Sequence, residues 1–135
     1  MSAMLTYNFE LTRENLETAL NWIAQKSIEN GATERQIFTA RLCSEELLMN
    51  LISHSQSIII NTVVQLEFSA GRLILTIIND GPSFNPLLTK PRSTDASLNT
   101  ARPGGWGIPF LRHFSDKLEY QHNNNQNIVS LEFNP

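Results

Sequence analysis

The fold of this chain is decided by residues 44–54, which read SEELLMNLISH. Apolar residues recur in this stretch at helical spacing, so it predicts an amphipathic helix with one buried stripe. The stripe consists of Leu47, Leu48, Leu51 and Ile52. Another face of the same helix carries Glu46, Asn50 and His54, because residues four apart stack one turn above another. Polar residues in this arrangement are usually the solvated side of a helix, so their chemistry depends on the rest of the chain.

Glu46 and Asn50 form a chemically useful pair one helical turn apart. A carboxylate can take a proton from water or a hydroxyl, and an amide oxygen is a hard ligand for Mg²⁺. Mg²⁺ usually keeps several waters and takes only one or two protein oxygens beside substrate phosphates, so a single Asn is enough. The pair indicates a functional site only if other segments of the chain supply a phosphate site.

Composition favours one globular domain spanning residues 1–135. Hydrophobic residues make up 41% and charged residues 17%, which is ordinary for a soluble protein. The net charge of −3, with no basic run, gives no reason to expect nucleic acid or an anionic membrane. Cys43 is the only cysteine, and neither a leader segment nor a membrane-spanning run is recognisable, so we expect a cytoplasmic protein.

The first part of the chain predicts one strand and two helices. Residues 4–11 alternate as a strand, and Thr12 caps a helix over residues 13–30 that Gly31 ends. A capping box at residues 33–36 starts the second helix, which runs to about His54. The expected core stripe of the first helix is Leu16, Ala19, Leu20, Ile23 and Ile28.

The second part predicts two hairpins separated by a long connection. Apolar runs at residues 58–68 and 73–78 form the first, an antiparallel hairpin with one covered face. Residues 118–122 and 128–133 form the closing hairpin. Between them, residues 85–103 show no period, which is typical of a functional lid or a disordered insert. A short helix with Pro109 in its first turn and Leu111 and Phe114 inward follows the lid.

Two further segments could meet a ligand. Glycines at 104, 105 and 107 precede the short helix and let backbone amides approach an anion, so we assign phosphate contacts to the amides of Trp106, Gly107 and Ile108. Asn79 ends a strand and could offer its amide oxygen to the amino group of a purine. Taken alone, each segment has a structural alternative: a flexible hinge for the glycines and a turn residue for Asn79.

The sequence shows no motif of a zinc site or of a serine hydrolase. The three histidines, at 54, 113 and 122, have neither zinc-motif spacing nor cysteine partners, and His54 fits a structural hydrogen bond. A Gly-x-Ser-x-Gly elbow for a serine hydrolase is absent from the sequence.

The order of these segments resembles a known superfamily. Glu46-x-x-x-Asn50, then residues 79–84 (NDGPSF), then residues 104–112 (GGWGIPFLR) resemble the N, G1 and G2 boxes of the histidine-kinase-like ATPases (GHKL, Bergerat fold). Within that superfamily the chain is most similar to the stand-alone anti-sigma-factor serine/threonine kinases. The resemblance covers nearly the whole chain, including the late strand that begins at Asn127.

The resemblance implies an α+β fold: a two-layer sandwich whose mixed, mostly antiparallel sheet is covered on one face by helices, with ATP and Mg²⁺ held under the lid. By position, Glu46 is the general base and Asn50 the Mg²⁺ ligand. The expected nucleotide contacts further include Asn79, Gly81, Phe84, Gly105, Trp106, Gly107 and Ile108. The chain departs from the family pattern at Asn79. The family has an Asp at this position, which accepts a hydrogen bond from the adenine amino group. In this chain an Asp, Asp80, follows one place later.

Three functions follow from the resemblance. The first is a kinase that phosphorylates a serine of a small antagonist protein and sequesters a sigma factor when the antagonist is absent. The second is a non-catalytic regulatory module that binds nucleotide and switches a partner. The third is a detached sensor histidine kinase domain, disfavoured because no helix pair presents a phosphoacceptor histidine. A gyrase-like or chaperone-like ATPase would need a transducer domain. The family resemblance also suggests a homodimer.

Overall fold

The computed structural model describes residues 3–55, 59–83 and 107–135. Five strands form one sheet in the order β1-β2-β3-β5-β4, and each neighbouring pair is antiparallel. The strands are β1 (Ala3–Glu10), β2 (Asn61–Ser69), β3 (Arg72–Asn79), β4 (Lys117–Asn123) and β5 (Gln126–Phe133). The helices are α1 (Arg13–Glu29), α2 (Glu34–Ser55) and α3 (Gly107–Phe114).

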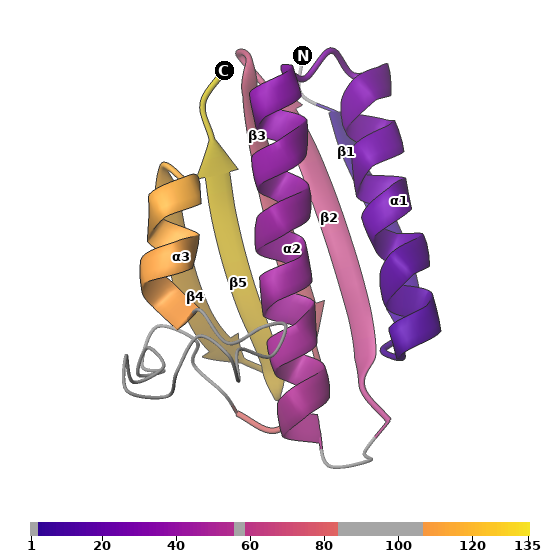
Figure 1. Ribbon diagram of the computed structural model, residues 1–135. Helices are drawn as coiled ribbons and strands as arrows, with labels where there is room; N and C mark the ends of the chain where they lie inside the picture. Colours follow the sequence, from indigo (N-terminus) through magenta and orange to yellow (C-terminus); the bar gives the residue numbers. More distant parts are fainter. Residues whose placement is uncertain (1–2, 56–58, 84–106) are drawn as a thin grey trace, which may run out of the picture.

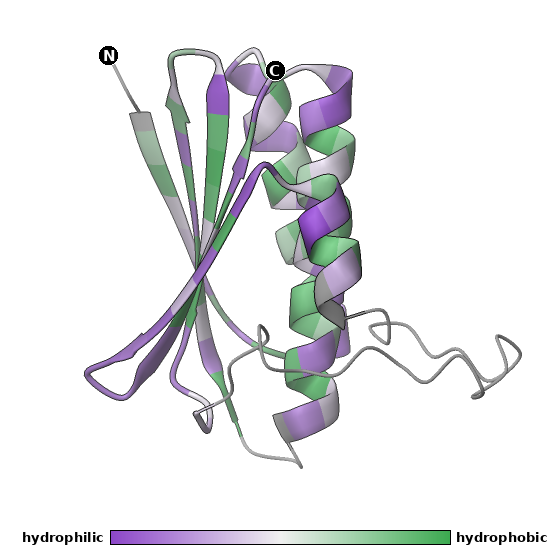
Figure 2. Cartoon of the chain, turned by 90° about the vertical axis from the view of Figure 1, so that its left-hand side faces the viewer, coloured by the Kyte–Doolittle hydropathy of each residue, from purple (hydrophilic) through white to green (hydrophobic). Residues whose placement is uncertain are grey.

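The three helices cover one face of the sheet and leave the other uncovered (Figures 1 and 2). Helix α2 lies in the middle, with α1 beside it over β1 and β2, and α3 on the other side next to β4 and β5 (Figure 1). Every second residue of β3 and β5 faces the helices and is buried, and β2 shows the same alternation from Thr62 to Leu66. The predicted α+β two-layer sandwich is therefore confirmed, although the described strands pair only antiparallel rather than in a mixed sheet.

Local chemistry sets the bounds of α1. The side chain of Thr12 accepts from the backbone N–H of Asn15, as the predicted cap requires, and Gly31 follows the helix with φ of 80°. The predicted core stripe is wrong at one end. Ile28 is 57% exposed, and Ser27 is buried in its place. Ser27 fits there because its hydroxyl donates to the carbonyl of Ile23, 2.7 Å away.

The predicted capping box at the start of α2 is confirmed. The backbone N–H of Thr33 donates to Oε1 of Gln36, and the N–H of Gln36 donates to Oγ1 of Thr33. The remaining amide group of Gln36 has a second task, because Nε2 donates to the carbonyls of Gly71 and Phe133. The same side chain thus caps the helix and joins it to the ends of β3 and β5.

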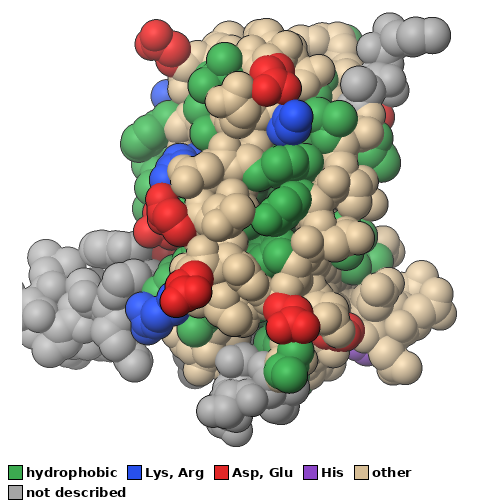
Figure 3. Space-filling view, turned by 90° about the vertical axis from the view of Figure 1, so that its right-hand side faces the viewer, with side chains coloured by type: hydrophobic (Ala, Val, Ile, Leu, Met, Phe, Trp, Pro, Cys, Tyr) green, Lys and Arg blue, Asp and Glu red, His purple; other side chains and the backbone are tan. Residues whose placement is uncertain are grey.

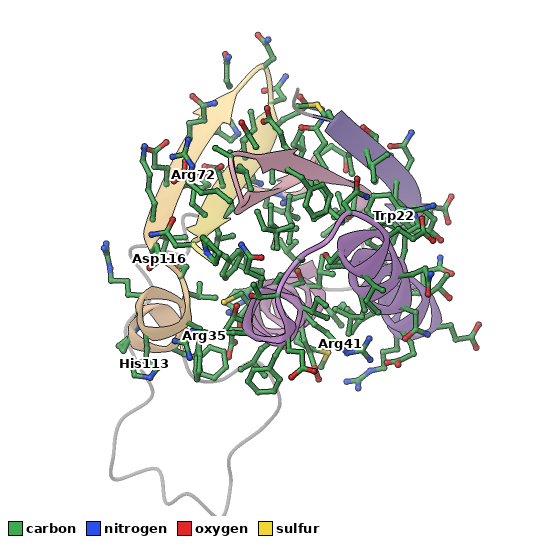
Figure 4. The ribbon with its side chains drawn as sticks, turned by 90° about the horizontal axis from the view of Figure 1, so that it is seen from above. Trp22, Arg35, Arg41, Arg72, His113 and Asp116 are labelled. Carbon is green, nitrogen blue, oxygen red and sulfur yellow. The ribbon has the colours of Figure 1, made fainter. Side chains whose placement is uncertain are left out.

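Helices α1 and α2 are also joined at the surface. Arg41 reaches from α2 towards α1, where its guanidinium lies 3.1 Å from a carboxylate oxygen of Glu17 (Figure 4). On the sheet side of α1, Trp22 stacks on Tyr7 of β1 with ring centroids 5.4 Å apart. On this side of the molecule, charged groups of both signs surround a strip of exposed hydrophobic atoms (Figure 3).

The observed strands differ from the predicted ones mainly at their ends. β1 ends at Glu10, and the N–H of Leu11 instead donates to the carbonyl of Ile60. β2 begins only at Asn61, so the apolar run ahead of it is not strand where it is described. In the closing hairpin, Asn124 and Asn125 have φ of 54° and 60°, which suits the tight turn predicted there.

The second half of α2, the end of β3 and the start of β5 meet at one end of the sandwich, opposite the two chain termini (Figure 1). Three predicted site residues, Glu46, Asn50 and Asn79, belong to these segments. Among the described helices, none combines the length and hydropathy needed to cross a membrane.

Candidate functional site

A row of polar side chains crosses the inner face of the sheet. Thr62 pairs with Asn79, and Asn79 pairs with Asn127, so the three lie side by side on β2, β3 and β5. Their exposed fractions are 1%, 2% and 1%. The same faces of these strands are otherwise apolar, and burying polar groups costs free energy unless they find partners. The row therefore indicates a site rather than ordinary packing.

Asn79 is held by two donors. Its Oδ1 accepts from the backbone N–H of Gly81 at 3.0 Å and from Nδ2 of Asn127 at 3.1 Å. An amide oxygen has two lone pairs, so both are used within the protein. The role expected for this oxygen, accepting from a purine amino group, is therefore already taken. The sequence did not reveal this because one of the donors lies 48 residues away.

Asn127 braces the loop that follows β3. Its Nδ2 also lies 3.3 Å from the carbonyl of Gly81 and 3.0 Å from that of Pro82. Its Oδ1 accepts from the hydroxyl of Tyr120 at 2.7 Å. The amide of Asn127 thus connects β4, β5 and residues 81–82, which fixes where the chain leaves the sheet.

Asp80 is engaged on the other side of that loop. Both of its carboxylate oxygens accept from Asn61, one from the backbone N–H at 2.8 Å and one from Nδ2 at 2.9 Å. The carbonyl of Asn61 in turn accepts from the N–H of Asp80. Asp80 therefore pins the end of β3 to the start of β2, and it does not supply the carboxylate that Asn79 lacks.

Gly81 has little room for a side chain because of its neighbours. A Cβ at this position would lie 3.0 Å from Cδ1 of Ile60 and 3.1 Å from Oδ1 of Asn79. A side chain would thus push against the bond by which Asn79 holds the Gly81 amide. The expected contact of Gly81 with the nucleotide stays a prediction.

Helix α2 brings Glu46 and Asn50 to the same end. Both are buried, at 3% and 7% exposed, whereas the adjacent Glu45 is exposed. Asn50 and Asn79 line a small recess whose remaining walls are mostly apolar. They line it together with Leu47, Leu51, Ile77, Asn127 and Val129. His54 lies one turn further and is exposed, and its Nδ1 lies 2.8 Å from the carbonyl of Asn50, in keeping with the predicted structural role.

Cys43 lies one turn before Glu46 and is fully buried. Burial raises the pKa of its thiol to about 12, and the negative charge of Glu46 contributes to the shift. A thiol that stays protonated is a poor nucleophile, so Cys43 acts as a small core residue.

The recess is lined by three amide side chains and four apolar ones. No group of three or more His, Cys, Asp or Glu residues in the described part of the chain could hold a metal ion. Oγ1 of Thr62 is buried and has no hydrogen-bond partner among the described residues, so these residues alone leave one group of the polar row unsatisfied.

Of the predicted site residues, Asn50 and Asn79 line one recess, Gly81 is hydrogen-bonded to Asn79, and Glu46 lies one turn before Asn50 on α2. Gly107 and Ile108 open α3, and Pro109 lies in its first turn as predicted. Phe84, Gly105, Trp106 and the predicted lid lie outside the described residues. The assignment of phosphate contacts to residues 106–108 therefore stays a prediction.

Sequence reasoning missed Asn127, Tyr120 and Thr62 as site residues. A signal was present for two of them, because Asn127 and Thr62 fall in step with inward-facing apolar residues of their strands. A polar residue at such a position needs a partner or a ligand. Tyr120 carried no comparable signal, since its partner Asn127 is known only once the closing hairpin is paired.

Comparison with known proteins agrees with this geometry. The family described as Histidine kinase-like ATPase domain matches residues 9–133, nearly the whole chain. The chain belongs to this family. It is 28% identical over 128 residues to the serine/threonine-protein kinase BtrW of Bordetella bronchiseptica, with 93% of this chain and 90% of BtrW covered.

A solved structure shows the same fold. The crystal structure of the RsbU and RsbW domains of Rv1364c from Mycobacterium tuberculosis matches 98% of this chain with a TM-score of 0.69 at 14% identity. The chain spans 32% of the length of that structure. The predicted kinase-like ATPase fold is thus confirmed, and the match places α2, β3 and β5 within a known architecture.

Proposed function

We propose that this member of the histidine kinase-like ATPase family is an ATP-dependent protein serine/threonine kinase of the anti-sigma-factor type. It transfers the γ-phosphate of ATP to a serine of a small antagonist protein, and it sequesters a sigma factor when the antagonist is absent. The similarity to BtrW over nearly the whole of both chains supports the reaction class. The partners follow from the resemblance to anti-sigma-factor kinases.

The observation that carries the proposal is the burial of Glu46 and Asn50 at the recess end of α2, beside an exposed Glu45. Burying a carboxylate is costly, and Glu46 is only 3% exposed. In this proposal, Glu46 orients the serine hydroxyl and accepts its proton. Asn50 offers its amide oxygen to Mg²⁺, which takes its other oxygens from phosphates and water.

When bound, ATP would supply the phosphoryl group, and Mg²⁺ would neutralise the charge that develops during its transfer. The remaining roles in nucleotide binding are assigned to residues of this protein. Asn127 and Asn79 hold residues 81–82 against the recess, and the apolar floor receives the base. The amides of Trp106, Gly107 and Ile108 are assigned to the phosphates from the sequence.

The proposal is tested by incubating the protein with labelled ATP, Mg²⁺ and candidate antagonist proteins. Label transferred to a serine of one antagonist supports the kinase. Nucleotide binding without transfer to any antagonist favours the second candidate, a non-catalytic regulatory module. That alternative has one specific observation in its favour, the amide of Asn79 where the family carries a carboxylate.

A further inference from the structure

The hydrogen-bond partners of the Asn79 amide determine which of its two ends is the oxygen and which is the nitrogen. Its two ends differ only in whether they accept or donate, so the neighbours decide which end lies where. The backbone N–H of Gly81 can only donate, and it lies 3.0 Å from one end of the Asn79 amide. That end must be the oxygen.

Asn127 confirms the same orientation independently. Its Nδ2 contacts the carbonyls of Gly81 and Pro82, and carbonyls only accept, so this end of Asn127 is its donor. The same donor lies 3.1 Å from Asn79, which must therefore present its oxygen there as well. Two separate donors thus hold the Asn79 oxygen inside the protein.

The other end of Asn79 is consequently a donor. Nδ2 carries two hydrogens, and it makes no hydrogen bond to a residue in the part of the chain that the structure describes. The side chain lines the recess together with Asn50 and Asn127 and is 2% exposed. A donor that lines a ligand site can be satisfied by an acceptor on the ligand.

From this geometry we propose that, because of Asn79, the base recess binds a purine with an oxygen at C6 at least as tightly as it binds adenine. The inference rests on the proposed function, in which this recess holds the base. A carboxylate at this position would accept from the amino group at C6 of adenine. The amide has the same shape but points a donor at that amino group, and a donor facing a donor is repulsive. An oxygen at C6 turns the contact into a hydrogen bond.

Asp80 does not restore selection for adenine. Its side chain is exposed, and both carboxylate oxygens are already bonded to Asn61 at the edge of the loop. The acid next to Asn79 in the sequence is therefore committed to a structural bond. Base selection depends on Asn79.

The test compares ATP with inosine triphosphate (ITP), whose base differs from adenine only at C6 and in the proton on N1. Dissociation constants of both Mg²⁺ complexes are measured by calorimetry for the wild-type protein and for Asn79→Asp. The variant keeps the shape and the acceptor for Gly81 and Asn127, so it should fold. We expect wild-type protein to bind ITP at least as tightly as ATP. Asn79→Asp should move the ratio of the two constants towards ATP by about tenfold or more, which corresponds to about 1.4 kcal/mol.

Asn8→Asp is the matched control, because it adds the same charge on an exposed position of β1. It should leave the ratio unchanged. Tighter binding of ATP than of ITP by wild-type protein, or an equal ratio in wild-type protein and Asn79→Asp, would overturn the inference while leaving the proposed kinase intact. Failure of both nucleotides to bind would overturn the proposed function and the inference together.

Discussion

The hydroxyl of Tyr120 on β4 donates to the side-chain oxygen of Asn127 on β5 at 2.7 Å. This bond holds the amide that positions Asn79 and residues 81–82, so it links the edge of the sheet to the candidate site. Tyr120→Phe removes the bond and leaves a buried acceptor without its donor. We expect the free energy of unfolding to fall by about 1 kcal/mol, as for a typical hydrogen bond, and nucleotide affinity to fall with it.

The measurement is urea denaturation of both proteins, with nucleotide titrations alongside. Tyr7→Phe is the matched control, because it makes the same change on β1 at a hydroxyl with no hydrogen bond to any described residue. If Tyr120→Phe and Tyr7→Phe behaved alike in both measurements, the brace between β4 and the site would have no energetic role.

Gln36 should contribute more to the stability of the fold than a helix cap alone would. Its Nε2 donates to the carbonyls of Gly71 and Phe133, and the side chain is 2% exposed. Gln36→Glu keeps the acceptor for Thr33 but places a buried carboxylate against two carbonyl oxygens. We expect a loss of about 3 kcal/mol or more in the free energy of unfolding at neutral pH.

Thr33→Ala removes only the cap and should cost about 1 kcal/mol. Chemical denaturation of the two variants separates the roles. An equal loss in both would show that the bonds from Gln36 to β3 and β5 contribute little.

Local signals in the sequence were enough for most elements. Thr12, Gly31 and the pair Thr33 and Gln36 act through neighbours a few residues away, so their roles could be predicted from spacing alone. The choice between Ser27 and Ile28 as the last buried residue of α1 could not, because it depends on how the helix is rotated against the sheet.

In the candidate site, too, features set by neighbouring residues could be predicted and features set by distant contacts could not. Glu46 and Asn50 lie one turn apart on a single helix, so their proximity could be predicted from that spacing. The orientation of the Asn79 amide was not, because it depends on Asn127 from another strand. Contacts between distant strands are set by sheet pairing, which the sequence pattern does not specify residue by residue.

Cys43 gives a pH prediction. An unfolded thiol loses its proton above about pH 8.5, whereas the folded one keeps it until its pKa of about 12. The stability contributed by the protonated thiol is therefore complete below pH 8.5 and falls as the pH rises towards the folded pKa. Between pH 8 and pH 10, wild-type protein should lose about 1–2 kcal/mol more stability than Cys43→Ala does.

Denaturation curves at the two pH values give this difference directly, and the comparison within each protein removes the cost of the smaller side chain. A thiol-specific reagent at pH 8 provides a second check, since the buried thiol should react only when the protein unfolds. Equal pH dependence of the two proteins, or fast labelling of the folded protein, would show that the thiol is not shielded.

The most direct test of the central claim is phosphoryl transfer by Glu46→Gln and Glu45→Gln with Mg·ATP and an antagonist protein. The two residues are adjacent, but Glu46 is buried and Glu45 is exposed. Gln keeps the size of the side chain and removes the basic charge. The account predicts that Glu46→Gln binds ATP normally and transfers phosphate about 10²–10⁴-fold more slowly, whereas Glu45→Gln transfers at the wild-type rate. Unchanged transfer by Glu46→Gln, or loss of transfer in Glu45→Gln alone, would contradict it.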